Sequence, residues 1–274
     1  MISVRNLTKR YESKEVVKDV TLNIEKGLIT SFIGPNGAGK STLLSMISRL
    51  MEANDGDVQI DGISLKNWKS KELAQKISIL RQSNNLNVRL TVRELVAFGR
   101  FPYSKGNLTE EDDKFINQAI DYLKLKDIED CYINELSGGQ KQRAYIAMVI
   151  AQDTEYILLD EPLNNLDMKH AVEIMRILRN IVDDLGKTVV IVIHDINFAS
   201  CYSDKIVALQ DGKIRYYDDT DKIINSEVLN DVFDMEFNVH HLGGKKICTY
   251  YEEGVCDCKH GDCIHNSRHL TIVQ

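Results

Sequence analysis

The chain has 274 residues, of which 43% are hydrophobic and 27% are charged, and its formal net charge is -7. This composition is typical of a globular protein with a sizeable core, and the acidic charge disfavours nucleic acid or anionic lipid as a partner. The sequence shows neither the roughly 18 consecutive apolar residues of a membrane-spanning helix nor a signal peptide. We therefore expect a cytoplasmic protein that would serve a membrane only by docking onto a partner that spans it.

The order of the expected elements indicates an α/β fold. Short strands are expected within residues 1–33, then a helix at 41–50, and then a strand, a helix and a strand over 56–80, with Asp61-Gly62 as a hairpin turn. Residues 84–150 are helix-rich and read as a subdomain inserted into the α/β core. After them, the apolar strands YILLDEP and TVVIVIHD flank a helix at 168–185, which indicates a buried parallel sheet.

The segment after the strand TSFI reads GPNGAGKST and fits the phosphate-binding template G-x-x-x-x-G-K-[ST]. Its glycines let backbone N–H groups approach phosphate oxygens, and the following helix presents its positive end to the same anion. Lys40 is expected to reach the β- and γ-phosphates of ATP, and the Ser41 hydroxyl to ligate Mg²⁺. The ATP-binding residues expected in this segment are Gly34, Pro35, Asn36, Gly37, Ala38, Gly39, Lys40, Ser41 and Thr42.

Two carboxylates end the apolar strand YILLDEP. The carboxyl ends of parallel strands face the ligand crevice, so we expect Asp160 to hold Mg²⁺ and Glu161 to polarise the water that attacks the γ-phosphate. The strand VVIVIHD brings His194 to the same edge, where it is expected to hydrogen-bond the γ-phosphate and this water. A solvated acidic turn and a structural histidine are the alternatives, and the nearby phosphate loop favours catalysis.

The segment LSGGQ offers a second helix end that can bind an anion. Ser137 is a good N-cap for a helix over 140–152, and the two glycines expose backbone donors. One γ-phosphate can hardly contact both this segment and the phosphate loop of the same subunit. We therefore predict a homodimer in which each ATP is held by the phosphate loop of one subunit and the LSGGQ segment of the other. The residues expected to bind ATP in this way from the partner are Ser137, Gly138, Gly139 and Gln140.

LSGGQ-KQR is the signature of the ABC ATPases, and residues 1–236 resemble that family, with its motifs in the family's order. The resemblance implies that Tyr11 stacks on adenine and that Gln82 is the Q-loop glutamine, which contacts Mg²⁺ or water and couples to the membrane subunit. It also implies that Asp167 of the D-loop links the two ATP sites and that His194 is the switch histidine. The D-loop reads NNLD here, where SALD or SNLD is more usual.

The same resemblance implies a domain plan. Residues of about 1–83 and 151–236 would form a P-loop NTPase core, a mixed sheet with an antiparallel β subdomain. Residues of about 84–150 would form the helical signalling subdomain.

The segment TVRELVAFGRFPY, residues 91–103, resembles the ATPases of bacterial iron(III)-siderophore and vitamin B12 importers. A permease helix would dock here, so Phe98, Phe101 and Tyr103 either form that contact or pack inside the helical subdomain. The resemblance implies iron(III)-siderophore uptake at the cytoplasmic face of the membrane, with two permease subunits and an external substrate-binding protein. An importer of vitamin B12 or haem, and a soluble ATPase of iron–sulfur assembly, are the alternatives.

Residues 237–274 depart from the family pattern and form a Cys/His-rich extension. Its thiolate and imidazole groups at short spacing could make a tetrahedral Zn²⁺ or Fe²⁺ site. The run does not pair C-x-x-C knuckles, so a tail that binds metal only adventitiously is the alternative. The candidate ligands are Cys256, Cys258, His260, Cys263 and His265.

Overall fold

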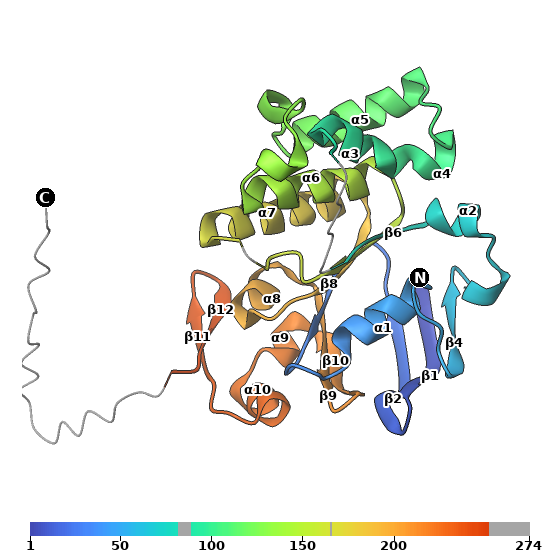
Figure 1. Cartoon of the computed structure of the whole chain (residues 1–274). Coiled ribbons are helices and arrows are strands. Elements are labelled where there is room, and N and C mark those ends of the chain that lie inside the picture. The colour runs from blue at the N-terminus through green and yellow to red at the C-terminus, as the bar shows by residue number, and fades with distance from the viewer. Residues whose placement is uncertain (82–88, 165, 252–274) are drawn as a thin grey trace, which may run out of the picture.

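A computed structural model of the chain describes residues 1–81, 89–164 and 166–251. Its centre is a six-stranded sheet in the order β10-β9-β3-β8-β7-β6, in which every neighbouring pair is parallel except β9 and β10 (Figure 1). The strands are β3 (Ile29–Ile33), β6 (Ile77–Leu80), β7 (Tyr156–Asp160), β8 (Thr188–Val192), β9 (Lys205–Gln210) and β10 (Lys213–Asp219).

The central sheet is buried on both faces. Successive residues along β7 enter different clusters: Leu158 packs with β1, β2 and α1, whereas Leu159 packs with the helices on the other face. Val190 and Ile191 of β8 divide in the same way. Side chains alternate between the two faces of a strand, so a strand covered on both faces is apolar throughout. This continuous apolar pattern is the one from which the buried parallel sheet was predicted.

A second sheet is antiparallel, with strand order β2-β1-β4-β5. Its turn at Asp61-Gly62 is confirmed, with positive φ values of 51° and 80° at the two residues. The first strand is longer than the expected ISV, because β1 keeps pairing with β2 as far as Tyr11 through several register shifts. The strands are β1 (Ile2–Tyr11), β2 (Lys14–Ile24), β4 (Asp55–Ile60) and β5 (Ile63–Ser64).

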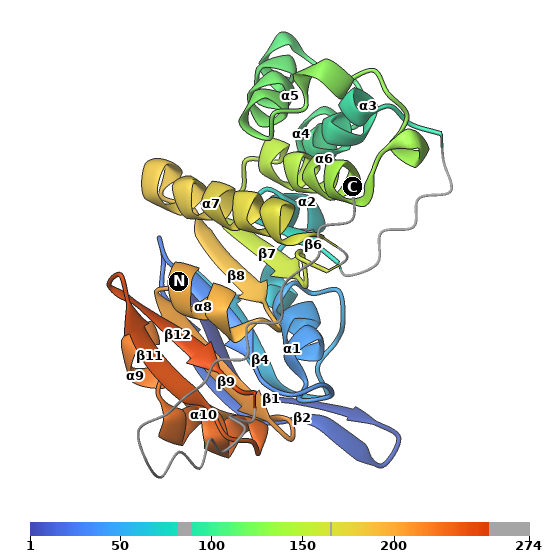
Figure 2. The ribbon, with the colours of Figure 1, turned by 90° about the vertical axis from the view of Figure 1, so that its left-hand side faces the viewer.

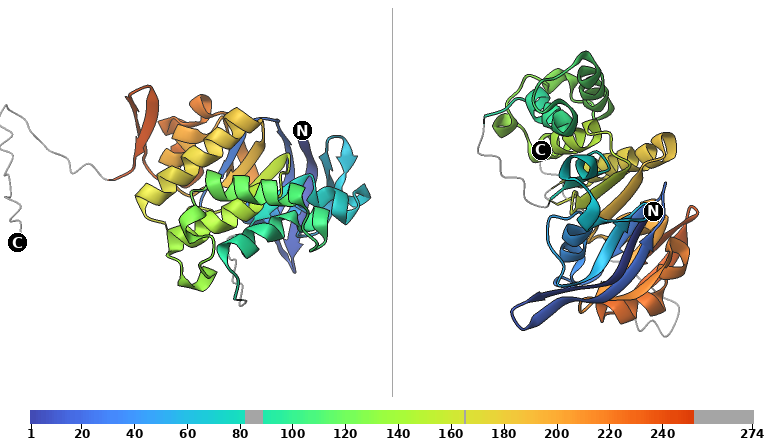
Figure 3. Two further views of the ribbon diagram at one scale, coloured as in Figure 1. Left: turned by 90° about the horizontal axis from the view of Figure 1, so that it is seen from above. Right: turned by 90° about the vertical axis from the view of Figure 1, so that its right-hand side faces the viewer.

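The helices divide between the sheets and a separate helical group. α3 to α6 gather at one end of the molecule, and β1 and β2 lie toward the other end (Figures 1 and 2, and the right view of Figure 3). Among the described residues, no helix is both long and apolar enough to cross a membrane. The α-helices are α1 (Lys40–Ile47), α2 (Ser70–Ala74), α3 (Val92–Ala97), α4 (Phe101–Ser104), α5 (Glu110–Tyr122), α6 (Gly138–Ala151), α7 (Met168–Leu185), α8 (Ile196–Tyr202), α9 (Thr220–Ile223) and α10 (Ser226–Phe233). Short 3-10 turns are η1 (Leu65–Asn67), η2 (Phe98–Arg100), η3 (Lys126–Ile128) and η4 (Ile133–Glu135).

The helical group is held together partly by a buried ion pair. Arg100 is 4% exposed, and its Nε donates to Asp112 Oδ1 at 2.9 Å while a terminal nitrogen donates to the Ala151 carbonyl at 2.9 Å. Gly99 lets the chain approach α6, because a Cβ there would lie 2.1 Å from the Met148 carbonyl oxygen. Within the segment 91–103, Gly99 and Arg100 therefore serve packing.

The described part of the C-terminal extension folds onto the sheet core. The strands β11 (Asn238–Leu242) and β12 (Lys245–Thr249) form a hairpin on α8. Asn197 of α8 accepts from the Cys248 N–H at 2.7 Å and donates to the Cys248 carbonyl at 3.2 Å. The Cys248 side chain is 2% exposed, and burial raises the pKa of its thiol to about 11. The thiolate form of cysteine is the one that binds metals, so the buried, protonated thiol of Cys248 is a poor metal ligand.

Candidate functional site

Three neighbouring strands end at one edge of the central sheet. β3 leads into the loop at Gly34, β7 ends at Asp160 and is followed by Glu161, and β8 leads to His194. Asp160 pairs with Val192, so the ends of β7 and β8 are in register. The expected convergence of these residues on the carboxyl edge of the sheet therefore follows from the strand order.

The expected phosphate-binding loop lies in close contact with the backbone of two strands. A Cβ at Gly34, where φ is 139°, would lie 2.0 Å from the Leu209 carbonyl oxygen. A Cβ at Gly39, where φ is 96°, would lie 2.6 Å from the Val16 carbonyl oxygen. Only glycine fits both positions, and the backbone of the loop is consequently fixed between β2 and β9.

Lys40 points back into this loop. Its side chain is 4% exposed, and Nζ donates to the carbonyl oxygens of Gly34 at 2.8 Å and Pro35 at 3.0 Å. Burial lowers the pKa of the Lys40 ammonium, against the opposing effect of the Glu161 and Asp160 carboxylates. A cation held by two neutral carbonyls beside a glycine-rich loop fits the binding of a polyphosphate.

Ser41 and Asp160 form an oxygen-donor pair at the same place. The Ser41 hydroxyl donates to Asp160 Oδ1 at 2.7 Å, and Asp160 is 8% exposed. Burial raises the pKa of Asp160, the hydrogen bond from Ser41 opposes this rise, and the nearby charge of Glu161 adds to it. One hydroxyl and one carboxylate leave room for phosphate oxygens and water, so the residues present fit Mg²⁺.

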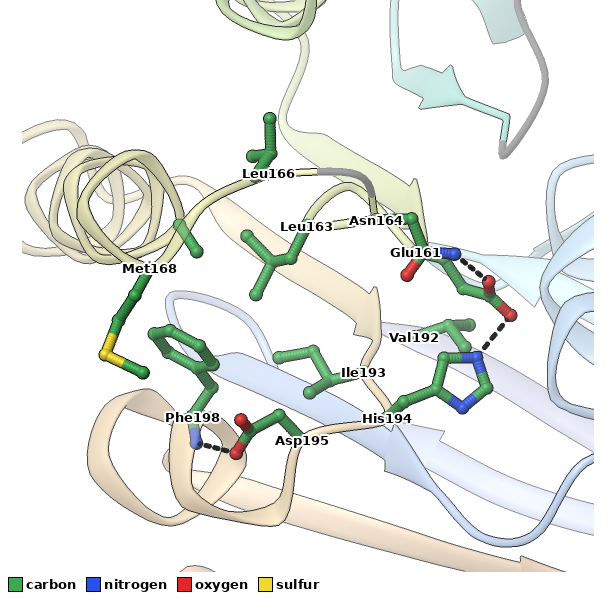
Figure 4. A pocket seen from close by; sticks show the side chains of 11 residues that line it. Glu161, Leu163, Asn164, Leu166, Met168, Val192, Ile193, His194, Asp195 and Phe198 are labelled. Carbon is green, nitrogen blue, oxygen red and sulfur yellow. Dashed lines mark hydrogen bonds and ion pairs between the residues drawn. The ribbon is translucent and has the colours of Figure 1, made fainter. Parts of the chain in front are cut away.

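Glu161 and His194 face one another beside this pair. His194 Nε2 lies 2.6 Å from Glu161 Oε1, and the Glu161 side chain is 10% exposed (Figure 4). Glu161 has a φ of 50°, an uncommon backbone conformation for a residue with a side chain. A cavity of 270 Å³ opens next to the pair and is lined by Asn164, Met168 and Phe198 among others. A carboxylate, an imidazole and an adjacent space are what a water-activating site requires.

The LSGGQ segment starts α6, at Gly138 rather than at residue 140. Gln140 donates its backbone N–H to Ser137 Oγ at 3.3 Å, and the Ser137 N–H donates to Gln140 Oε1 at 3.0 Å. This reciprocal pair is a capping box, so the expected N-cap role of Ser137 is present. Gly139 faces α7, because a Cβ there would lie 3.0 Å from the His170 ring.

Asp167 caps α7 from the D-loop segment. Its Oδ1 accepts from the His170 N–H at 2.9 Å, and its Oδ2 lies 2.8 Å from His170 Nδ1. Because the His170 ring also lies against Gly139, one side chain contacts both the D-loop and the LSGGQ segment.

The structure thus brings five expected site residues together: Lys40, Ser41, Asp160, Glu161 and His194. Tyr11 is 47% exposed near the tip of the β1–β2 hairpin, and its hydroxyl lies 3.0 Å from Met51 Sδ. Ser137 to Gln140 lie in the helical group instead. Gln82 of the Q-loop and Asn165 of the D-loop lie outside the described residues, as do Cys256, Cys258, His260, Cys263 and His265 of the tail.

One contact was not foreseen from the sequence. Asn164 Nδ2 donates to Glu161 Oε2 at 2.5 Å. The signal in the sequence was an amide side chain three positions after the glutamate, at the first D-loop position where serine is more usual.

Comparison with known proteins agrees with this geometry. Residues 17–164 match the pattern of the ABC transporter family. The petrobactin import ATP-binding protein YclP of Bacillus subtilis (strain 168) is 57% identical over 92% of this chain and 100% of its own length. The petrobactin import ATP-binding protein FatE of Bacillus anthracis is 49% identical over 87% of this chain and 96% of its own length.

A solved structure shows the same fold. The ATP-binding cassette MJ0796, in a dimeric post-hydrolysis state bound to ADP and Pi, is 35% identical with a TM-score of 0.72, covering 80% of this chain and 99% of its own. The expected α/β fold is confirmed by this likeness. The chain belongs to the ABC transporter family, as one of its ATP-binding, ATP-hydrolysing subunits.

Proposed function

We propose that this ATPase is the energy-coupling subunit of a bacterial importer of iron(III)-siderophores and that it works as a homodimer. The relatives named for petrobactin import are similar along nearly the whole chain, at 57% and 49% identity. Petrobactin is therefore the first cargo to test. The single structural observation that carries the ATPase activity is the Glu161–His194 pair at 2.6 Å beside the Ser41–Asp160 pair at 2.7 Å.

Hydrolysis follows from the positions of these side chains. Lys40 and the loop N–H groups bind the β- and γ-phosphates, and Glu161 accepts a proton from the water that attacks the γ-phosphorus. His194 turns from Glu161 to the γ-phosphate once ATP is bound. Mg²⁺, when held by Ser41 and Asp160 and contacted by Gln82, would supply positive charge against the phosphate oxygens.

The second half of each ATP site would come from the partner subunit. Ser137 to Gln140 present a helix N-terminus, and Asp167 lies at the start of α7, so both are suited to contact ATP across a dimer. The dimeric state of the MJ0796 cassette supports this arrangement. ATP binding would close the dimer, and hydrolysis would reopen it.

The surface of the helical group supports docking onto a permease at the cytoplasmic face of the membrane. Phe98 and Phe101 are 53% and 57% exposed, whereas Tyr103 stacks on Arg100 at 4.0 Å. A Phe98→Glu/Phe101→Glu variant should abolish uptake while the isolated ATPase keeps its turnover. Leu185→Glu, at an equally exposed apolar residue on α7, is the control. Unchanged uptake in the double variant would contradict this docking surface.

A Zn²⁺ or Fe²⁺ site in the tail is a separate proposal that rests on residue types alone. Within the described ranges, no group of three or more Cys, His, Asp or Glu side chains is placed to hold a metal ion. Calorimetric titration of the full chain with Zn²⁺ and Fe²⁺ should give stoichiometric binding that Cys256→Ser/Cys258→Ser removes. Equal binding by both proteins would exclude a specific site.

The function is tested by growth and by turnover of Glu161→Gln. A strain that lacks this gene should fail to grow on iron(III)-petrobactin as sole iron source, and only the wild-type chain should restore growth. Purified Glu161→Gln should hydrolyse ATP about 10²–10⁴ times more slowly, because a general base contributes that factor, while still binding ATP. Normal growth of the deletion strain on every siderophore would point to another cargo or to iron–sulfur assembly. Full ATPase activity of Glu161→Gln would remove the role given to Glu161.

A further inference from the structure

The two oxygens of the Glu161 carboxylate are held by different parts of the chain. His194, after β8, lies 2.6 Å from Oε1, and Asn164, on the turn after β7, donates to Oε2 at 2.5 Å (Figure 4). His194 is 39% exposed and Glu161 is 10% exposed, so the carboxylate is the more enclosed member of the pair. His194 and Asn164 thus each contribute a contact that orients the Glu161 carboxylate.

The turn brings Asn164 to the carboxylate through local backbone geometry. The Asn164 N–H donates to the Glu161 carbonyl at 3.3 Å, and the positive φ of Glu161 reverses the chain direction directly after β7. Asp167 then caps α7 and fixes the far end of the same segment. Because the backbone bond already closes the turn, the Asn164 side chain is available for the carboxylate.

We propose that Asn164 is a positioning residue for ATP hydrolysis, which keeps Glu161 oriented when His194 leaves it for the γ-phosphate. The inference rests on the proposed role of Glu161 as general base. A carboxylate that loses one of its donors is held less firmly, and small misplacements of a reacting group cost large factors in rate. The Asn164 amide holds Oε2, so Oε1 is left to accept the proton of the attacking water.

An amide suits this task better than an ionisable group. It stays neutral and cannot take the proton itself, whereas the His194 ring can. Lys40 and Asp160 are charged neighbours of Glu161, whereas Asn164 offers a neutral donor from the D-loop. A partner subunit that contacts the D-loop would therefore change how Asn164 orients the Glu161 carboxylate.

The test compares the steady-state kinetics of three variants at position 164. Asn164→Ala removes the donor, and kcat should fall about 10-fold with the KM for MgATP within about 2-fold, because the phosphate-binding residues are untouched. Asn164→Asp keeps the shape but places a second carboxylate beside Glu161, and kcat should fall further. Asn164→Ser restores a hydroxyl donor, and kcat should exceed that of Asn164→Ala.

The controls separate this inference from the proposed function and from folding. Asn107→Ala, at an exposed asparagine of the helical group, should match the wild type. If Glu161→Gln is inactive while Asn164→Ala and Asn164→Asp turn over like the wild type, the positioning role is wrong and the role of Glu161 stands. If Glu161→Gln is fully active, the role of Glu161 as general base fails, and the positioning role of Asn164 fails with it. A parallel loss of kcat, ATP affinity and thermal unfolding temperature in Asn164→Ala would mean that the residue serves folding only.

Discussion

The helices α1 and α6 both begin in glycine-rich segments. The two segments differ in whether a side chain already accepts hydrogen bonds from the backbone N–H groups at the start of the helix. α1 follows the phosphate loop, with Gly39 as its N-cap in a left-handed conformation and with no side chain bound at the cap. α6 follows LSGGQ, and Ser137 and Gln140 cap it reciprocally. The loop before α1 is enclosed by backbone from β2 and β9, whereas the atoms nearest to a Cβ at Gly139 of α6 belong to the His170 side chain.

This difference suits the proposed dimer, in which the start of α1 binds phosphate strongly and the start of α6 binds it only conditionally. The donors at the start of α1 are not taken up by a side-chain cap, so a phosphate can bind them without first breaking a bond. At α6 the Ser137 hydroxyl and the Gln140 N–H already pair, so an anion must replace that contact. The second site is therefore suited to bind only when a partner subunit brings ATP to it.

The largest effect should come from the enclosed loop. Gly34 has a φ of 139°, and in Gly34→Ala the new Cβ would lie 2.0 Å from the Leu209 carbonyl oxygen of β9. This clash cannot be relieved without moving the backbone of the loop or of β9. We expect a loss of about 3 kcal/mol in the free energy of unfolding, from strain and overpacking together, and a loss of ATP binding. Chemical denaturation and nucleotide titration measure the two effects. Gly37→Ala is the control for the stability measurement, because Gly37 also has a positive φ, of 79°, but no atom lies within 4 Å of its Cβ position. Equal stability of Gly34→Ala and Gly37→Ala would contradict the enclosure.

This contrast also explains what the sequence could predict. The turn between β3 and α1 was predicted as a phosphate loop because its residue types follow from backbone demands that any such turn must meet. The helix at 168–185 was predicted with its observed bounds, and the Asp167 cap seen in the structure is a further local signal. Such signals lie within one segment, so the sequence alone carries them.

Other features depend on partners far along the chain. The Arg100–Asp112 pair is buried by the packing of α5 and α6, which no local pattern encodes. The length of β1 depends on register shifts against β2 and β4. The Asn164 contact accompanies a positive φ at Glu161, which no local residue pattern predicts.

A smaller effect should come from the cap of α6. Ser137→Ala removes the hydroxyl that accepts from Gln140, and the free energy of unfolding should fall by about 1 kcal/mol. ATP binding to a single subunit should not change, because the residues of the phosphate loop lie elsewhere. ATPase turnover at high protein concentration should fall, because hydrolysis in the proposed mechanism needs the closed dimer. Weakened ATP binding to the isolated subunit would mean that the two helix ends do not act separately.

The smallest effect tests the side-chain contact at Gly139. Alanine favours a helix by up to about 1 kcal/mol over glycine, but in Gly139→Ala its Cβ would meet the His170 ring at 3.0–3.2 Å. Asp167 Oδ2 lies 2.8 Å from Nδ1 of that ring, so the ring cannot simply turn away, and we expect Gly139→Ala to be neutral or slightly destabilising.

In a His170→Ala background the same substitution should be stabilising. Chemical denaturation of the four proteins of this double-mutant cycle gives a coupling energy, which should be about 0.5–1 kcal/mol. A coupling of zero would mean that the ring yields freely. In that case His170 would not link the D-loop to the start of α6, and the two segments would have to be positioned independently before a partner subunit meets them.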